Sequence, residues 1–140
     1  MAVERMDHFT VLTKDAIATA EFYSFVLGLE LGPRPNFSFP GVWLYSQHQP
    51  ILHVVERDEI PSGAGVLDHM AFWAADLAGF VARLEARGIA YDLRRVPEGG
   101  PAAGVWQLFF HDPNGARVEI DLAASELPPQ EPQVPTRLAW

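Results

Sequence analysis

Hydrophobic and polar positions follow the same order twice along this chain. Met6–Val11 reads MDHFTV, and Leu67–Phe72, which begins 61 positions later (67 against 6), reads LDHMAF. These segments lie within residues 6–12 and 67–73, which are short and rich in strand-forming residues, so each of these two ranges is expected to be a β-strand. A plan that recurs at this interval indicates two similar structural modules.

Helix signals follow both of these strands. Asp15 and Asp76 stand where a carboxylate can accept hydrogen bonds from the unpaired N–H groups that open a helix. Apolar residues then recur at intervals of three and four, which is the spacing of a helix with one buried face. Gly28 and Gly88 follow at positions suited to a left-handed C-cap. One helix is therefore expected after the first strand of each half.

Three further strands are predicted in each half, and they are expected near 29–34, 42–46, 50–56, 89–96, 105–111 and 116–122. Asp112–Gly115 (DPNG) is a strong turn signal between the last two strands. The predicted fold class is α+β, with two βαβββ modules whose mixed sheets form a metal-lined cup. The expected division is a first module at 1–56, a linker at 57–66, a second module at 67–122 and a Pro-rich C-terminal arm at 123–140.

Composition narrows the functional classes. The 140 residues are 49% hydrophobic and carry a formal net charge of −8, with no run of Lys or Arg. Nucleic acids and anionic membranes are therefore poor candidates as partners. The first residues carry charges where a signal peptide needs an apolar core, and no apolar run approaches the roughly 20 residues of a membrane span. These features lead us to expect a cytoplasmic protein. Because cysteine is absent, a metal site with thiolate ligands is excluded.

Three polar residues lie among apolar ones in the predicted strands. His8 and His69 occupy matching positions of the two modules, and Glu119 lies between two apolar residues of the last strand. An ionised carboxylate that faces an apolar interior costs several kcal/mol unless it is paired or bound to a metal. Pairing of the modules would bring the histidines together, and two imidazoles with one carboxylate form a ligand set with open positions for substrate. The alternatives are hydrogen-bonded structural histidines and a solvent-exposed Glu119.

Two further residues are candidates for proton transfer. His53 lies in the apolar segment ILHVV with no evident structural partner in the sequence, and Tyr45 lies in the preceding predicted strand. His53 is placed where a fourth metal ligand would come from, so its open roles are ligand, base in the cavity and structural histidine. The catalytic hypothesis assigns proton transfer to His53 or Tyr45.

Four segments carry a resemblance to a known family: MDHFTVLTKD, FYSFVLGLEL, LDHMAFWAADL and FFHDPNGARVEI. They resemble the vicinal-oxygen-chelate superfamily, which includes glyoxalase I, bleomycin-resistance proteins and extradiol dioxygenases. The resemblance covers residues 6–122. It implies that the metal-binding His of the first strand is His8, that the His opening the second module is His69, and that the Glu of the final strand is Glu119. Glyoxalase-like members often have Glu or Gln where this chain has His53, which is a departure from glyoxalase I.

The resemblance implies a metal-dependent reaction on a small-molecule substrate. Members of the superfamily bind adjacent substrate oxygens to a metal and stabilise negative charge on them. The ligand set suits Fe, Mn, Zn or Ni, so a ring-cleaving dioxygenase acting on an aromatic diol and a related lyase or isomerase both stay open. The alternative is a binding or resistance protein that sequesters an apolar or aromatic ligand. Single-domain relatives usually form dimers, which implies a homodimer whose modules pair across chains.

Aromatic residues at alternating strand positions are candidates for the substrate pocket, whose predicted wall comprises Trp43, Trp73, Gln107 and Phe109. Phe37 and Phe39 lie in a Pro-bounded loop that would cover this wall. Such a wall favours an aromatic or otherwise flat apolar substrate, whereas ordinary core packing is the alternative. One anion contact would come from the guanidinium group of Arg34, Arg94 or Arg95.

Overall fold

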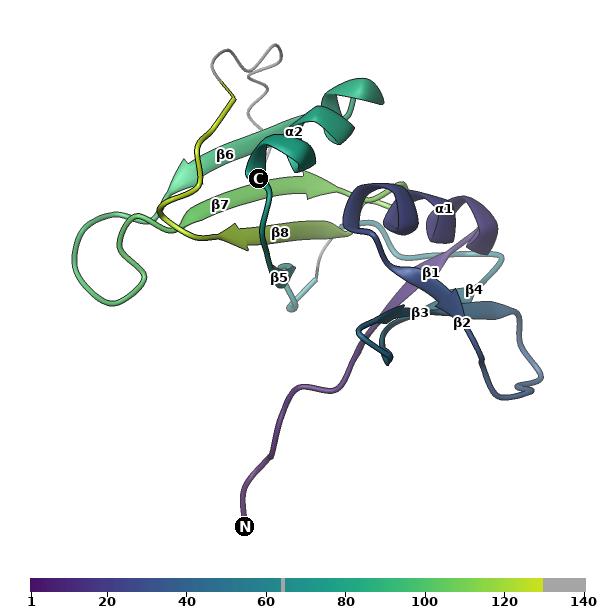
Figure 1. Cartoon of the computed structure of the whole chain (residues 1–140). Coiled ribbons are helices and arrows are strands. Elements are labelled where there is room, and N and C mark those ends of the chain that lie inside the picture. The colour runs from purple at the N-terminus through teal and green to yellow at the C-terminus, as the bar shows by residue number, and fades with distance from the viewer. Residues whose placement is uncertain (64, 130–140) are drawn as a thin grey trace. The chain divides into compact units, whose positions relative to one another are not determined.

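The computed structural model describes residues 1–63 and 65–129 (Figure 1). The chain divides into two compact units, Met1–Ser62 and Gly63–Trp140, which we call unit 1 and unit 2. The boundary between the units falls within 57–66, the segment expected to link the modules. Residues 130–140, which make up most of the predicted C-terminal arm, lie outside the described residues.

Within its described residues, each unit contains one helix and four strands in the order βαβββ. Unit 1 comprises β1 (Phe9–Thr13), α1 (Ala16–Leu27), β2 (Glu30–Gly32), β3 (Gly41–Ser46) and β4 (Gln49–Glu56). Unit 2 comprises β5 (Met70–Ala74), α2 (Leu77–Ala86), β6 (Tyr91–Arg95), β7 (Trp106–His111) and β8 (Arg117–Leu122). In the described part of the chain, neither helix has the length and apolar character needed to cross a membrane. The predicted α+β class with two βαβββ modules is confirmed.

The strands of each unit form one mixed four-stranded sheet. The strand order is β1-β4-β3-β2 in unit 1 and β5-β8-β7-β6 in unit 2. In each sheet the first two strands of this order run parallel, and the other neighbours are antiparallel. The two sheets are therefore topologically equivalent, and a residue of one sheet has a counterpart in the other.

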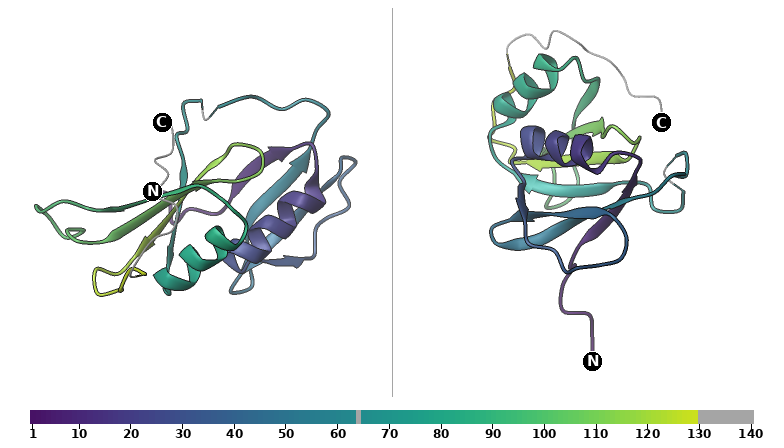
Figure 2. Two further views of the ribbon diagram at one scale, coloured as in Figure 1. Left: turned by 90° about the horizontal axis from the view of Figure 1, so that it is seen from above. Right: turned by 90° about the vertical axis from the view of Figure 1, so that its right-hand side faces the viewer.

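A hydrophobic core lies between each helix and one face of its own sheet (Figure 2). In unit 1, Tyr23 of α1 and Leu44 of β3 are fully buried. In unit 2, Leu84 of α2 and Leu108 of β7 are fully buried, and Ile120 of β8 is 1% exposed. Successive strand residues point to opposite faces, so the residues between these core positions face away from the helix. We call this second face of each sheet its site face, because it carries the candidate functional residues.

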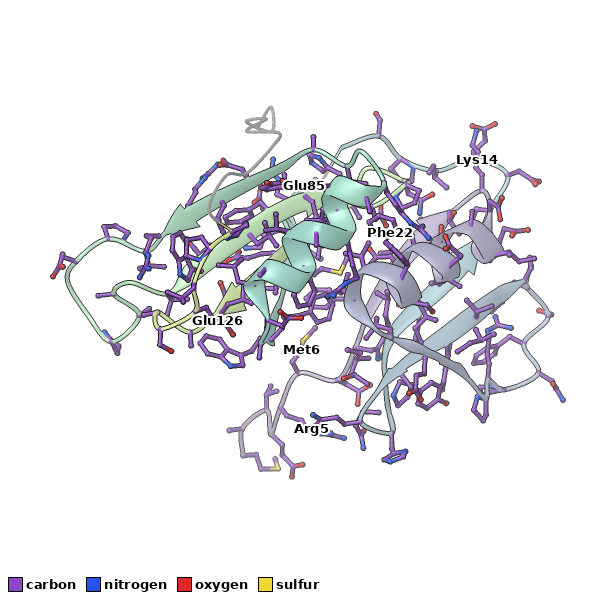
Figure 3. All side chains as sticks on the ribbon, turned by 45° about the horizontal axis from the view of Figure 1, so that its top comes forward. Arg5, Met6, Lys14, Phe22, Glu85 and Glu126 are labelled. Carbon is purple, nitrogen blue, oxygen red and sulfur yellow. The ribbon has the colours of Figure 1, made fainter. Side chains whose placement is uncertain are left out.

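Carboxylates hold the N-terminal ends of both helices. Asp15 and Asp76 cap α1 and α2 as predicted, each accepting a hydrogen bond from the backbone N–H three residues ahead. A second carboxylate joins each cap: Glu56 accepts from the first N–H of α1 at 2.9 Å, and Glu126 accepts from the first N–H of α2 at 3.2 Å. Figure 3 shows Glu126 beside the N-terminal end of α2. Gly28 ends α1 with a φ of 71°, the left-handed conformation expected there.

The two repeated histidines differ from the prediction in one respect. His8 and His69 do not lie inside strands but immediately before them, because β1 begins at Phe9 and β5 begins at Met70. Backbone pairing with the neighbouring strand starts only at those residues. The side chains of the two histidines are 36% and 35% exposed, so they lie at the edge of each sheet rather than in its core.

Candidate functional site

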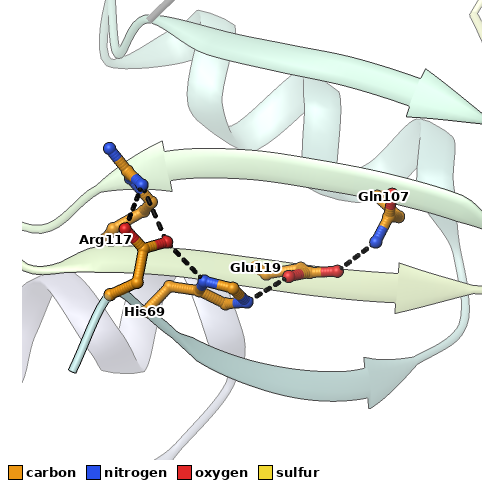
Figure 4. A network of polar contacts seen from close by, with 5 residues as sticks. His69, Gln107, Arg117 and Glu119 are labelled. Carbon is orange, nitrogen blue, oxygen red and sulfur yellow. Dashed lines mark hydrogen bonds and ion pairs between the residues drawn. The ribbon is translucent and has the colours of Figure 1, made fainter. Parts of the chain in front are cut away.

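A chain of polar contacts crosses the site face of unit 2 (Figure 4). His69 lies at its centre, with Nδ1 2.8 Å from Oδ2 of Asp68 and Nε2 2.7 Å from Oε2 of Glu119. Glu119 is only 4% exposed, so its carboxylate depends on such partners. A neutral imidazole carries only one N–H, so it can donate to only one of these two carboxylates. The contact at the other nitrogen needs either a second proton or a cation.

Two longer side chains hold the ends of this chain of contacts. Arg117 donates from Nη1 to both oxygens of Asp68 at 2.8 Å, and Gln107 donates from Nε2 to Oε1 of Glu119 at 2.6 Å. The hydrogen bond with His69, followed by that from Arg117, lowers the pKa of Asp68. An ionised Asp68 favours a proton on Nδ1 of His69, so Nε2 is the nitrogen left to interact with Glu119.

Asp121 places a second acid beside Glu119. Burial, followed by the hydrogen bond and the charge of Glu119, raises the pKa of Asp121 to about 6. Oδ1 of Asp121 is buried and has no hydrogen-bond partner among the described residues. Asp121 is not among the predicted site residues, although two positions of separation in a strand place it on the same face as Glu119.

His8 in unit 1 repeats the arrangement of His69. Its Nδ1 is 2.7 Å from Oδ2 of Asp7, and this hydrogen bond is the largest cause that lowers the pKa of Asp7. The His8 ring stacks on His53, with ring centroids 3.8 Å apart, and Trp43 stacks on His53 at 4.0 Å. Since β4 lies between β1 and β3, His53 is held between two nearly parallel rings.

The His53 ring presents one nitrogen that no described residue contacts by a hydrogen bond. The ring donates a hydrogen bond to the backbone carbonyl of Pro50, and Nε2 is buried with no partner among the described residues. The donor is therefore Nδ1, and Nε2 carries a lone pair. Burial, followed by the charge of His8, lowers the pKa of His53, and the hydrogen bond to Pro50 opposes this effect. A neutral imidazole with a free Nε2 can accept a proton or bind a metal.

Each unit carries one group of polar residues on its site face, and we call these two groups half-sites. The strand register makes them direct counterparts. His53 lies opposite Thr10 in unit 1, and Glu119 lies opposite Ala71 in unit 2. Thr10 and Ala71 hold the same place in the sequence repeat. Each half-site therefore consists of an Asp–His pair before its first strand and a polar residue at one fixed position of its last strand.

The chemistry of these donors fits a divalent metal. The Nδ1 atoms of His8 and His69 are both hydrogen-bonded to an aspartate, which leaves Nε2 as the donor, the usual arrangement of a metal-bound imidazole. In unit 2 this nitrogen already faces the carboxylate of Glu119. Within either unit, the described residues bring no three His, Asp or Glu side chains together as metal ligands. Unit 2 thus contains two of the three predicted ligands, and unit 1 contains the third.

The other predicted site residues have distinct surroundings. Trp73 on β5 is 68% exposed, whereas Phe109 on β7 is 6% exposed and meets the His69 ring edge-to-face, with centroids 6.1 Å apart. The hydroxyl of Tyr45 donates to the backbone carbonyl of Pro33 at 2.5 Å. Its proton is therefore engaged by the backbone rather than available to a substrate.

Sequence reasoning missed the residues that hold the two histidines. Asp7 and Asp68 precede His8 and His69 in both copies of the repeat, so the repeated Asp-His pair is a signal that could have identified them. Arg117 offers no such signal, because it meets Asp68 from 49 positions away along the chain.

Comparisons with known proteins give a family match, a relative in sequence and neighbours in structure. A family model described as the Glyoxalase/Bleomycin resistance protein/Dioxygenase superfamily matches residues 5–120. Glyoxylase I 4 from Arabidopsis thaliana is 33% identical over 122 residues, which cover 82% of this chain and 68% of that protein. A putative glyoxalase family protein from Bacillus anthracis has a TM-score of 0.71 at 21% identity, over 87% of this chain and 97% of that chain. The oxidase ChaP-H2 has a TM-score of 0.66 at 25% identity, over 88% of this chain and 95% of that chain.

The family match includes both half-sites. Its range of 5–120 contains the two Asp–His pairs, His53 and Glu119. Members of this superfamily typically use a divalent metal, and the nitrogen and oxygen donors described above suit one. The chain therefore belongs to the glyoxalase/bleomycin resistance protein/dioxygenase superfamily.

Proposed function

We propose that this protein is a metal-dependent enzyme that acts on a small molecule with two adjacent oxygens, and that His8, His69 and Glu119 hold the metal. Its relatives include proteins named a glyoxylase I and an oxidase, so the reaction classes considered are a lyase or isomerase reaction and a dioxygenation. Fe, Mn, Zn or Ni each suits two imidazoles and a carboxylate. The proposed location is the cytoplasm.

The contact between His69 and Glu119 supports this proposal most directly. Nε2 and Oε2 are 2.7 Å apart, and the carboxylate is buried. The proton of a neutral His69 is engaged at Nδ1 by Asp68, so no proton remains for the Nε2 side. A divalent cation held by His69 and Glu119 would neutralise the buried carboxylate and satisfy the imidazole lone pair.

The protein residues would prepare the ligands and position the substrate. When bound, a divalent metal supplies positive charge that stabilises negative charge developing on the substrate oxygens. Asp7 and Asp68 hold Nδ1 of the two histidines, and Gln107 donates to one oxygen of Glu119, so these contacts would orient the residues that hold the metal. These contacts reduce the reorganisation that binding would otherwise require.

We assign proton transfer to His53. Its Nδ1–H is held by Pro50, so its tautomer is set, and its buried Nε2 has a lone pair that no described residue uses. This nitrogen would take a proton from the substrate and return it in a later step. Tyr45 is left out of the proposal because its hydroxyl donates to Pro33.

Metal analysis of anaerobically purified protein tests the proposal. Wild-type protein is expected to retain about one metal per chain, and Glu119→Gln is expected to lower metal affinity at least about tenfold, because it removes a ligand charge. Glu98→Gln, an exposed carboxyl of the same unit, is the matched control and should leave the affinity unchanged. Iron would favour oxygenase chemistry, and zinc, nickel or manganese would favour a lyase or isomerase. Full metal affinity in both Glu119→Gln and His69→Ala would exclude this ligand set.

The second candidate function is sequestration of an aromatic ligand without chemistry. It is favoured by the stacked rings of unit 1, where His53 lies between His8 and Trp43 and where Phe37 stacks on Phe39. Stable protein that contains no metal, and whose affinity for an aromatic ligand is unchanged by Glu119→Ala, would replace the enzyme proposal with this one.

A further inference from the structure

Unit 1 carries a continuous row of aromatic rings along its site face. Phe39 and Phe37 stack with ring centroids 5.1 Å apart, and Phe37 lies 6.3 Å from Trp43. Trp43 stacks on His53, and the row ends at His8. Phe37 is 45% exposed, so part of the row is available to a ligand.

Two guanidinium groups lie at the far end of this row. Cζ of Arg34 is 5.0 Å from the ring centroids of both Phe37 and Phe39, and Cζ of Arg57 is 5.2 Å from that of Phe39. Arg34 also donates from Nη2 to the backbone carbonyl of Phe39 at 2.9 Å, and Arg57 donates from Nη1 to that of Glu56 at 3.0 Å. The positive charges are thus held in place by rings and backbone carbonyls.

Among the described residues, no acidic side chain forms an ion pair with either of these two groups. In the described part of the chain, neither Arg34 nor Arg57 forms an ion pair, although the chain carries a net charge of −8. Arg94 and Arg117 of unit 2 do pair with aspartates. Two guanidinium groups that flank one ring and pair with no acid among the described residues favour an anion from outside the chain, because the planar fork of donors binds a carboxylate or a similar group.

The backbone of β3 makes room for one of these groups. A Cβ added to Gly41 would stand 3.2 Å from Nη2 of Arg34 and would collide with the backbone carbonyl of Val54. Gln107 holds the corresponding place in the sheet of unit 2. The glycine at this position therefore allows the Arg34 side chain to lie close against the sheet.

We propose that Phe39, Phe37 and Trp43, together with Arg34 and Arg57, form a substrate subsite for a flat aromatic ring system that carries an anionic group. The aromatic rings of the ligand stack on the row, and its acidic substituent pairs with the two guanidinium groups. His8, a proposed metal ligand, lies at the other end of the row from the two guanidinium groups. A substrate of the proposed metal site would therefore have its two adjacent oxygens at one end and its anionic group at the other. This last statement rests on the proposed function, whereas the subsite itself does not.

Binding of simple probes to metal-free protein tests the subsite. We use 2-naphthoate, the neutral alcohol 2-naphthylmethanol and the non-aromatic anion cyclohexanecarboxylate, and we measure affinity by calorimetry in the presence of EDTA. Because both the ring and the charge contribute, 2-naphthoate is expected to bind about tenfold more tightly than either of the other probes. Equal affinity for 2-naphthoate and the alcohol, or no binding at millimolar concentration, would overturn the proposal.

Matched variants locate the binding to this surface. Arg34→Met keeps an apolar stem but removes the charge, so it should abolish most of the preference for 2-naphthoate, and Arg34→Lys should retain part of it. Trp43→Leu should weaken binding of both naphthyl probes. Arg83→Met is the control, because Arg83 also lies over a phenyl ring, with Cζ 4.5 Å from the centroid of Phe80 in unit 2. An unchanged preference in folded Arg34→Met protein would contradict the proposal.

The metal affinity of the same preparations separates the two proposals. Protein that prefers 2-naphthoate but binds no metal would refute the proposed metalloenzyme and leave the subsite intact. Protein that binds metal but shows no preference among the three probes would refute the subsite and leave the metal proposal intact. Thermal unfolding of each variant shows whether a loss of binding reflects loss of the fold.

Discussion

Asp68 influences which nitrogen of His69 carries a proton. The carboxylate accepts from Nδ1 at 2.8 Å and is itself held by Arg117, so Nε2 is left facing Glu119. Asp7 makes the equivalent contact to His8 at 2.7 Å. These partners matter to the proposed site because the ring orientation of a metal-binding histidine depends on the hydrogen bond at its other nitrogen.

Removal of this partner is expected to weaken metal binding without unfolding the protein. Asp68→Ala should lower metal affinity by about 10- to 100-fold, since it frees the ring and allows the proton to move to Nε2. The melting temperature of metal-free protein should change little, because the Asp68 side chain is 62% exposed. Titration calorimetry measures the affinity, with Glu98→Ala as the control. An affinity equal to that of wild type would show that Asp68 has no role in positioning the ligand.

His53 is the residue whose change should separate chemistry from metal binding. In an assay with a validated substrate, His53→Gln is expected to lower kcat by about 100-fold or more, because a general base contributes at least this factor. Metal affinity should stay within about twofold of wild type if Nε2 acts as a base rather than as a ligand. Full turnover in the variant would remove His53 from the mechanism, and lost metal affinity would make it a ligand instead.

At the scale of elements, both helices begin against two carboxylates. One carboxylate is the N-cap Asp, and the other is a Glu that comes from outside the helix: Glu56 at the end of β4 for α1, and Glu126 beyond β8 for α2. Negative charge is favourable at this end of a helix, where backbone N–H groups lack partners. The same contact thus arises twice from different positions in the two modules.

Glu126 is expected to stabilise unit 2 through this contact. It accepts from the backbone N–H groups of Asp76 and Leu77 at 2.9 and 3.2 Å. Glu126→Ala should therefore lower the free energy of unfolding by about 1 kcal/mol, the usual effect of removing a capping side chain. Urea unfolding measures the change, and Glu98→Ala again serves as control. Equal stability of the two variants would mean that Asp76 alone is sufficient to cap α2.

At the scale of the whole molecule, the proposed ligands are divided between the two units. His8 belongs to unit 1, and His69 and Glu119 belong to unit 2. We propose that the protein is a homodimer in which unit 1 of one chain and unit 2 of the other supply the ligands of each metal. A symmetric dimer of this kind would contain two identical sites.

Subunit mixing tests this arrangement. His8→Ala and His69→Ala each remove one ligand, so neither variant alone should bind metal tightly. If sites are shared across chains, a heterodimer of the two variants has one site with both defects and one intact site. Co-refolded equal amounts should therefore recover about a quarter of the wild-type metal capacity, because about half of the dimers are heterodimers. No recovery in dimers shown by light scattering to have exchanged would place each site within one chain.

Local features of the chain were predictable from the sequence. The N-caps Asp15 and Asp76 and the glycine that ends α1 depend on residues close together along the chain. The repeat at an interval of 61 residues can be read directly from the order of the residues. Strand alternation and helical spacing are also local patterns. They were sufficient to identify two βαβββ modules, and the resemblance of four segments identified the superfamily.

Contacts between distant parts of the chain required the tertiary structure. Strand pairing puts His53 and Glu119 at the same register position of the two sheets, and it brings Arg117 to Asp68 across 49 positions. The fold also brings Arg57 over the ring of Phe39, which lies 18 positions earlier in the chain (57 against 39). A sequence pattern reflects interactions between residues that are near one another along the chain. These contacts depend instead on which strands pair and in which register. For that reason the sequence identified the residues that could act, and the tertiary structure decided which partners hold them.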